Sequence, residues 1–330
     1  MSKSLRKGKL VTLVLLMLCI SIFPVEVLAS DGVETSEVTF LPQSMESGWG
    51  LETIRAPQVW EKSKGEGVVV AVIDSGVDFS NELLKENKWH NKKEVPDEKD
   101  NDGNGYVDDL SGYSFSDEEG PLYYHGTFVA GVVAKTAPKV KVMDLHLLHS
   151  GGYFFATEWK KLIEAIDYAI DNGADVINLS LYFRVDPPSE FYRVVKRAYR
   201  ANIPIVSIAG NNNKKVSNFK DHKGMIVVAA VNRDLKKASF SNYGKVVDVF
   251  APGEEVVSVN PDGEYVIDSG TSLSAGYVSG VIALLLSSSP DLTVPEVKES
   301  ISRTARKLEG KKIDLKLIDA GELLQKKSQS

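Results

Sequence analysis

Cysteine is almost absent from this chain, which has one, Cys19, among its 330 residues. A framework of disulfides is therefore excluded. Cys19 follows Leu18, whereas a lipoprotein acceptor cysteine normally follows a small residue, so we do not expect a lipid on it either. Outside the cell such a chain must rely for stability on packing, with a bound metal as a further source.

The chain also lacks an excess of positive charge. The chain has 39 Lys and Arg against 45 Asp and Glu, a formal net charge of −6. Nucleic-acid binding is disfavoured, because it would need a basic surface. The remaining composition, 43% hydrophobic and 25% charged, is that of an ordinary globular protein and excludes disorder as the main state.

The N-terminus lacks an apolar run long enough for a membrane span. The run from Leu10 to Ile20 follows four basic residues and is soon interrupted by Pro24. With the small residues before Ser30, this pattern is typical of a secretory signal peptide cleaved after Ala29. We expect residues 1–29 to be removed and the mature protein to be secreted, with no membrane attachment.

The chain after the predicted signal peptide divides into two parts. Residues 30–48 are polar with isolated apolar side chains, which indicates a short pro-segment or a flexible N-terminal arm. Residues 49–330 contain no repeat and no change of composition that would mark a boundary, so we expect one domain there.

Continuous apolar runs predict strands buried on both faces, as in a parallel sheet. The runs are Gly67–Ile73, Val140–Leu148, Asp175–Leu181, Ile203–Ile208, Met225–Val231 and Val246–Phe250. Amphipathic or apolar stretches between and after them predict helices. These are Trp159–Asp171, Phe191–Tyr199, Ser272–Ser287 and Val294–Ala305, the last opened by a capping box of Thr293 and Glu296. The order of elements predicts an α/β fold.

Four polar residues stand where predicted strands end or helices begin. Asp74 follows the first strand, and Asn211 follows the fourth. His125 precedes a run of small residues, and Ser272 precedes an apolar helix. Peptide hydrolysis needs a nucleophile, a base held in one tautomer and donors for the negative charge that develops. Taken singly, each residue could equally be a helix cap, a turn residue or a hydrogen-bonded core residue.

The segments around these residues resemble the signature blocks of the subtilisin family. The blocks are Val70–Val77, His125–Thr127, Ala209–Asn211 and Gly270–Ser272, and the likeness extends from about Trp49 to Lys307. The resemblance implies a three-layer αβα subtilisin-like fold with a central, mostly parallel sheet of about seven strands. It also implies a secreted serine endopeptidase in which Ser272 forms an acyl-enzyme, and chemistry that requires no cofactor.

The same resemblance implies roles for the other residues. His125 would be the proton shuttle, Asp74 its orienting partner, and Asn211 the oxyanion donor. A substrate would bind along the residues that line the pocket before the cut: Ser180, Leu181, Tyr182, Ala209 and Gly210.

Two departures from the family pattern favour narrow specificity. Tyr182 stands where the family usually has a glycine. The pro-segment is too short for the folded chaperone domain that secreted subtilisins usually carry. These features resemble lantibiotic leader peptidases, which trim one precursor peptide, and predict a monomer acting on such a peptide. The alternatives are a broad-specificity degradative subtilisin and a non-catalytic peptide-binding processing chaperone.

An acidic loop predicts a possible calcium site. Its candidate ligands are Asp100, Asp102, Asn104 and Asp108, which alternate oxygen-bearing side chains around a glycine turn. The twelfth position is Ser111 rather than Glu, which argues against an EF-hand. A structural calcium ion and a solvated acidic turn are both compatible with this pattern.

Overall fold

The computed structural model describes residues 26–28, 48–118, 122–183, 185–216, 222–308 and 313–325. The predicted signal peptide and pro-segment lie outside these residues except for β1 (Glu26–Leu28) and Gly48, so both remain predictions. β1 pairs antiparallel with β5 (Tyr153–Phe155). In the described part of the chain, no helix has the length and hydropathy that a membrane crossing requires.

The described residues form a central sheet of nine strands, in the order β12-β13-β9-β8-β7-β6-β2-β4-β3. Every neighbouring pair is parallel except β12 and β13. The bounds are β2 (Val69–Asp74), β3 (Gly112–Ser114), β4 (Lys141–His146), β6 (Val176–Leu179), β7 (Ile205–Ile208), β8 (Met225–Val231), β9 (Val249–Pro252), β12 (Arg306–Leu308) and β13 (Leu315–Leu317). The expected α/β class with a mostly parallel central sheet is confirmed. β3, β12 and β13 have three residues each, too few for a sequence pattern to reveal.

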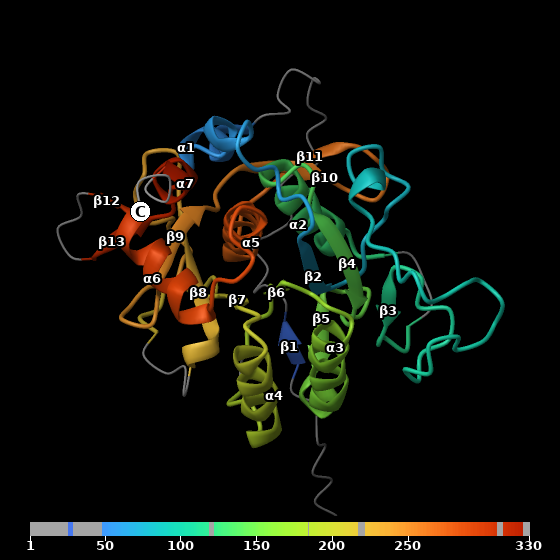
Figure 1. Ribbon diagram of the computed structural model, residues 1–330. Coiled ribbons are helices and arrows are strands. Elements are labelled where there is room, and N and C mark those ends of the chain that lie inside the picture. The colour runs from blue at the N-terminus through green and yellow to red at the C-terminus, as the bar shows by residue number, and fades with distance from the viewer. Residues whose placement is uncertain are drawn as a thin grey trace, which may run out of the picture.

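Helices cover both faces of this sheet (Figure 1). α3 (Trp159–Asp171) has the predicted bounds, and three others agree with prediction to within two residues: α4 (Ser189–Arg200), α5 (Thr271–Ser287) and α6 (Val294–Thr304). The predicted capping box is present, because the Glu296 carboxylate accepts the Thr293 backbone N–H at 2.8 Å. The bounds of α2 (Tyr124–Thr136) were not predicted, because most of its residues are buried and leave no polar face to mark a helical period.

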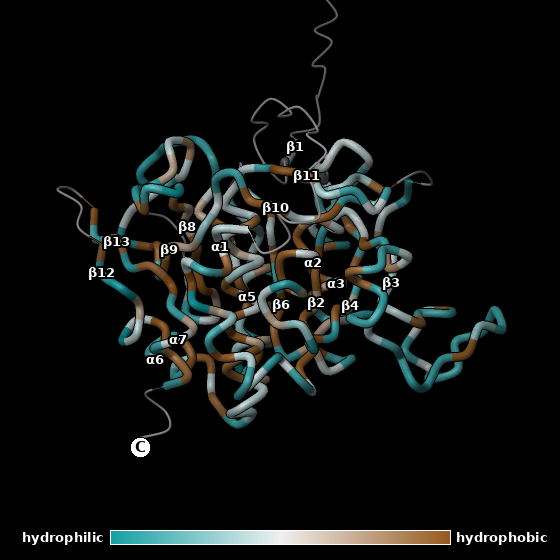
Figure 2. Tube along the Cα trace, turned by 90° about the horizontal axis from the view of Figure 1, so that it is seen from above, coloured by the Kyte–Doolittle hydropathy of each residue, from teal (hydrophilic) through white to brown (hydrophobic). Residues whose placement is uncertain are grey.

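Successive residues of β2 face different cores, as expected for a strand between two layers of helices. Val70 and Val72 lie in a hydrophobic cluster with residues of α2 and α5. Ala71 and Ile73 lie in a second cluster with residues of α3 and α4. Figure 2 shows hydrophobic residues along the strands and central helices, and hydrophilic ones in the outer loops. The domain therefore has the predicted three layers.

α5 is buried along its length except at Ser287 and packs directly on α2. Glycines permit this close approach: a Cβ atom on Gly280 would lie 2.5 Å from the Cβ of Thr136. The two helix axes are thus held together by packing in the middle of the core. Their N-terminal ends carry Ser272 and His125.

Shorter elements surround this framework. They are α1 (Gly48–Thr53), α7 (Ala320–Gln325), the hairpin of β10 (Val256–Val259) and β11 (Tyr265–Asp268), and single-turn helices at Pro57–Val59, Lys85–Asn87, Ala156–Glu158 and His222–Gly224.

Candidate active site

Asp74 and His125 form a buried pair at the carboxyl end of β2. The His125 Nδ1 atom lies 2.8 Å from Asp74 Oδ1 and 3.0 Å from Oδ2. Asp74 is fully buried, and His125 is 3% exposed. Because the carboxylate can only accept, it holds the proton of neutral His125 on Nδ1 and leaves Nε2 with a lone pair. This is the tautomer that a general base needs.

Ser75 and two glycines place His125 over Asp74. The Ser75 hydroxyl accepts the Gly126 backbone N–H at 2.9 Å and donates to the Tyr123 carbonyl at 2.8 Å. A Cβ atom on Gly126 would lie 2.3 Å from the Gly76 carbonyl oxygen, so a larger residue could not bring α2 this close to the end of β2. The Ser-Gly after Asp74 and the Gly after His125 are thus part of the site.

Two opposing effects act on the pKa of His125. Burial lowers the pKa of the imidazole, and the charge and hydrogen bond of Asp74, together with the charge of Asp268, raise it, so the net shift is upward. The physical cause is that a positive imidazolium beside the Asp74 carboxylate is stabilised even inside the protein. A catalytic cycle that briefly protonates His125 is therefore supported by its surroundings.

Ser272 is the second residue of α5, at the helix end where backbone N–H groups point outward. Its side chain is buried, and its Oγ has no hydrogen-bond partner among the described residues. The partial positive charge of a helix N-terminus favours negative charge at this position. A hydroxyl here is suited to attack a carbonyl carbon, and the neighbouring N–H groups are suited to receive the oxyanion.

Asn211 is fixed beside Ser272 by the first residue of α5. Its Oδ1 accepts the backbone N–H of Thr271 at 3.0 Å and the Thr271 hydroxyl at 2.8 Å. Since Oδ1 takes both donors, the Nδ2 group remains as the donor that Asn211 can offer to a substrate. The structure thus brings Asn211, which follows β7, and Ser272, at the start of α5, to the same sheet edge.

Asn242 is a residue of this site that sequence reasoning missed. Its Nδ2 donates to the Ala209 carbonyl at 2.8 Å, and its Oδ1 accepts the N–H groups of Asn212 and Lys214 at 3.1 and 2.7 Å. It therefore holds the turn that carries Asn211. The one hint in the sequence is that Asn242 stands in a segment similar to the subtilisin family. That similarity does not reveal its contact with Asn212, which lies 30 residues away in the chain.

The five predicted substrate-contact residues fall into two neighbouring segments. Ser180, Leu181 and Tyr182 follow β6, and Ala209 and Gly210 follow β7, its parallel neighbour. The Ser180 hydroxyl reaches Asn178 Oδ1 at 2.8 Å and the Ser272 carbonyl at 3.4 Å. Both segments therefore lie at the edge of the sheet that holds Ser272.

A second carboxyl group, Asp144 on β4, lies near Asp74 and was not predicted. Burial, together with the charge of Asp74, raises the pKa of Asp144 to about 7, although the Val77 backbone N–H acts in the opposite direction. One of its oxygens, Oδ1, is buried with no hydrogen-bond partner among the described residues. Such a carboxyl group keeps its proton up to a higher pH than an exposed aspartate does.

We expect Asp144→Asn to make the protein more resistant to unfolding at alkaline pH. The folded pKa lies above the unfolded value of about 3.9, so folded wild type loses stability as pH rises from about 4 to 7, by roughly 2–4 kcal/mol in all. Urea unfolding at pH 5 and pH 8 measures this. Asp234→Asn, at an exposed carboxylate, is the control, and equal slopes for wild type and Asp144→Asn would contradict the expectation.

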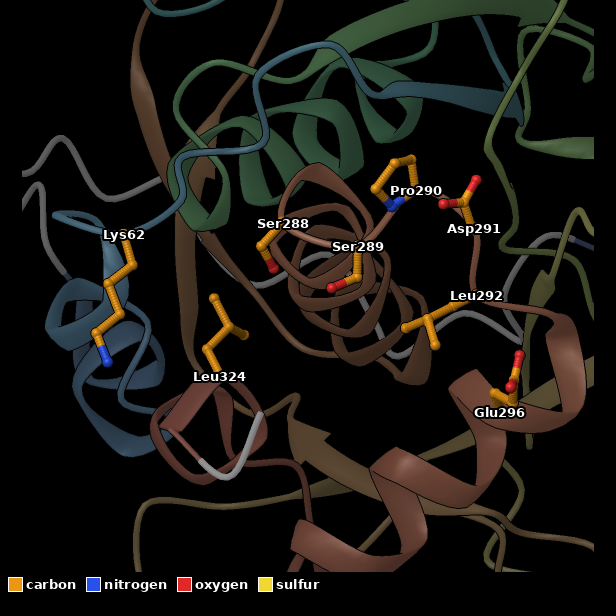
Figure 3. A pocket seen from close by; sticks show the side chains of 8 residues that line it. All are labelled: Lys62, Ser288, Ser289, Pro290, Asp291, Leu292, Glu296 and Leu324. Carbon is orange, nitrogen blue, oxygen red and sulfur yellow. The ribbon is translucent and has the colours of Figure 1, made fainter. Parts of the chain in front are cut away.

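A surface hollow of about 660 Å³ lies at the opposite end of α5 (Figure 3). Its lining residues are Lys62, Ser288, Ser289, Pro290, Asp291, Leu292, Glu296 and Leu324. Ser288 caps the C-terminus of α5, roughly 24 Å along the helix from Ser272 at 1.5 Å per residue. The hollow is therefore separate from the residues that could perform chemistry.

The carboxylates of two predicted metal ligands, Asp100 and Asp108, accept hydrogen bonds from the backbone of their own loop. Backbone N–H groups occupy the Asp100 carboxylate, from Gly103 at 2.7 Å and from Gly105 at 2.8 Å. The N–H groups of residues 97 and 98 occupy Asp108 at 3.1 Å. The reason is that short carboxylates in turns bond to nearby backbone. Among the described residues, Asp102 lies in a group with Glu94 and Asp109, whose carboxylate oxygens are within 4.8 Å of one another.

Comparison with known proteins agrees with this geometry. The Subtilase family profile matches residues 65–317. An intracellular serine protease of Paenibacillus polymyxa is 33% identical over 278 residues, which cover 77% of this chain and 79% of that protein. Thermitase of Thermoactinomyces vulgaris is 31% identical over 276 residues, covering 79% and 89% of the two chains.

A solved structure shares the fold as well. The crystal structure of a cold adapted subtilisin-like serine proteinase superposes with a TM-score of 0.64 at 26% identity, covering 78% of this chain and 90% of that one. The profile spans well over half of the chain, and the buried Asp-His pair, the helix-borne serine and the asparagine lie within the matched residues. The chain belongs to the subtilase family of serine peptidases.

Proposed function

We propose that this protein is an endopeptidase of narrow specificity that matures a precursor peptide, with lantibiotic leader removal as the candidate reaction. Ser272 is the nucleophile, His125 the base, Asp74 its orienting partner and Asn211 an oxyanion donor. The observation that supports the chemistry is the buried contact of His125 with Asp74 at the sheet edge that also holds Ser272.

The reaction proceeds through a covalent acyl-enzyme. Ser272 Oγ attacks the scissile carbonyl carbon while His125 Nε2 takes the hydroxyl proton. The oxyanion that forms accepts hydrogen bonds from Asn211 Nδ2 and from backbone N–H at the start of α5. His125 then gives its proton to the leaving amine, and a water molecule activated by His125 hydrolyses the ester to free Ser272.

The position of Tyr182 supports the proposal of narrow specificity. A Cβ atom placed on Gly210 would lie 2.5 Å from both Cδ2 and Cε2 of the Tyr182 ring. The ring therefore lies directly over the Gly210 backbone, between the two segments that line the pocket. A pocket filled in this way accepts a small side chain before the cut and excludes a large one.

An extended peptide also has an edge on which to bind. The segment Glu26–Leu28 of the chain itself pairs with β5 in antiparallel register. This pairing supports binding of a substrate as an added strand, in which main-chain bonds give affinity and side-chain pockets give selectivity. We propose that the enzyme acts on its precursor as a monomer.

The test compares peptides that differ only in the residue before the cut. Wild type should cleave after alanine at least about tenfold faster in kcat/KM than after phenylalanine. Tyr182→Ala should reverse this preference by opening the pocket. Tyr192→Ala, at a half-buried tyrosine of α4, is the matched control and should keep the wild-type preference.

Two results would contradict the proposal. One is equal cleavage after phenylalanine and alanine by wild type. The other is efficient digestion of casein with no preference among lanthipeptide precursors, which would favour a broad degradative enzyme.

We also propose that the protein is exported. The basic N-terminus, the apolar run from Leu10 to Ile20 and the small residues before Ser30 support this. Relatives of this chain include a protease named as intracellular, so N-terminal sequencing of protein from the culture medium is the deciding measurement. A first residue of Ser30 is expected, and retention of the uncut chain inside the cell would contradict export.

A further inference from the structure

The hairpin of β10 and β11 brings a carboxylate, Asp268, to the edge of the peptidase site. Asp268 is the last residue of β11, and α5 begins three residues later. The Tyr124 hydroxyl donates to Asp268 Oδ2 at 2.8 Å, and Tyr124 directly precedes His125 on α2. β10 also packs on α2. The hairpin thus holds Asp268 at the N-terminal ends of the two helices that carry Ser272 and His125.

Only neutral groups bond to the Asp268 carboxylate. Oδ1 accepts the Ser269 backbone N–H at 2.6 Å, and Oδ2 accepts the Tyr124 hydroxyl. In the described part of the chain, no Lys, Arg or His forms an ion pair with Asp268. Asp268 is half-buried, and its charge contributes to the raised pKa of His125. Because each carboxylate oxygen can accept two hydrogen bonds, both can take a further donor from a bound molecule.

Two tyrosine rings connect this carboxylate with His125. The ring of Tyr123 is stacked with that of His125 at a centroid distance of 6.4 Å, and the rings of Tyr123 and Tyr124 lie 4.8 Å apart. Both tyrosines are half-buried, so part of each remains accessible. Aromatic rings beside a carboxylate suit a long cationic side chain, because its aliphatic stem packs on the rings while its charged end reaches the oxygens. Lysine and arginine have this form.

The place of the hairpin indicates which part of a peptide Asp268 would meet. The segments proposed to line the pocket before the cut follow β6 and β7. α2 and α5 lie between those strands and the hairpin of β10 and β11 (Figure 1). A peptide whose residue before the cut lies over β6 and β7 therefore directs the residues after the cut, which follow the leaving amine at His125, toward the hairpin. Asp268 faces these later residues.

We propose that Asp268 selects substrates with a lysine or arginine among the first two residues after the scissile bond. This inference deepens the proposed function and rests on the roles given there to Ser272 and His125. A carboxylate without a cationic partner attracts a positive side chain of the substrate and repels a negative one, so it discriminates in both directions. With Tyr182 restricting the residue before the cut, the enzyme reads its precursor on both sides of the bond.

Peptides that keep alanine before the cut and differ only after it test this inference. One series carries Lys, Gln or Glu at the first position after the cut, and a second series carries them at the next position. In at least one series, wild type should cleave the Lys peptide about fivefold faster in kcat/KM than the Gln peptide, and at least about tenfold faster than the Glu peptide. Raising the salt concentration from about 0.01 M to about 1 M should reduce this preference, because ions screen the charges.

Asp268→Asn keeps an acceptor for the Tyr124 hydroxyl and removes the charge. It should cleave the three peptides at rates within about twofold of one another. Asp268→Lys should reverse the order and favour the Glu peptide, a result that damage to the fold alone could not produce. Asp262→Asn, at an exposed carboxylate between β10 and β11, is the matched control and should keep the wild-type preference.

Either of two outcomes would overturn the inference. The first is equal cleavage of the Lys, Gln and Glu peptides by wild type in both series. The second is a wild-type preference that persists in Asp268→Asn. If Ser272→Ala still abolishes hydrolysis of every peptide, such a result counts against the role of Asp268 and leaves the proposed nucleophile in place. Conversely, cleavage after phenylalanine as fast as after alanine, with the Lys preference retained, would contradict the narrow pocket alone.

Discussion

Replacing Ser272 with alanine should lower kcat/KM for peptide hydrolysis by about 10⁵-fold or more, the effect typical of removing the nucleophile from a triad. Without Oγ no acyl-enzyme can form, so only the weak help of the oxyanion donors remains. The fold should be unaffected, because Oγ makes no hydrogen bond with a described residue. Peptide hydrolysis measures the loss of turnover, and covalent labelling by a fluorophosphonate measures the loss of the nucleophile.

Ser274 provides the matched control, since it lies on the same helix and is equally buried. Its hydroxyl donates to the carbonyls of Ala251 and Pro252 at 3.1 and 3.0 Å. Ser274→Ala should therefore cost some stability while fluorophosphonate labelling persists. Labelling that survives in Ser272→Ala but disappears in Ser274→Ala would show that the nucleophile is assigned to the wrong residue. Folded wild type that takes no label would favour a peptide-binding protein without catalysis.

Asp74→Asn should lower kcat by about 10⁴-fold with little change in KM. The amide that replaces the carboxylate can donate to His125 Nδ1, which favours the tautomer with its proton on Nε2. That tautomer cannot accept a proton from Ser272. The amide oxygen can still accept the Ser75 backbone N–H, a 2.8 Å bond in the wild type, so the turn after β2 should persist.

Asp175→Asn distinguishes this role from a structural one. Asp175 is a carboxylate bonded to the same strand, where it accepts the Val69 N–H at 2.8 Å at the opposite end of β2. Asp175→Asn should therefore change kcat by no more than a few-fold. An Asp74→Asn protein that loses affinity for substrate but keeps kcat, or that is no slower than Asp175→Asn, would rule out the tautomer argument.

Much of the framework could be predicted because its signals are local. Strands buried on both faces appear as continuous apolar runs, and α3 shows its bounds through an apolar face of helical period. Asp74 and Asn211 could be placed at one edge because parallel strands end together there. The capping box at Thr293 likewise follows from residues three apart.

The remainder depends on contacts between distant segments. Whether Tyr182 turns into the pocket or away from it is decided by packing over Gly210, which no local pattern reveals. Asn242 and Asp144 reach the site from separate strands and loops. In the acidic loop, spacing alone does not show that backbone N–H groups bond to Asp100 and Asp108, nor that Glu94 faces Asp102 and Asp109.

The glycine-mediated seating of α5 on α2 also bears on how such an enzyme could be redesigned. The proposed nucleophile and base lie on two helices, and the contacts that align these helices are deep in the interior, at Gly276 and Gly280. Substitutions at these buried glycines would shift the two helices and so misalign the reacting side chains, although they do not contact those side chains. Substitutions confined to the substrate pocket, such as at Tyr182, leave that alignment intact. New selectivities should therefore be attainable there with little loss of kcat.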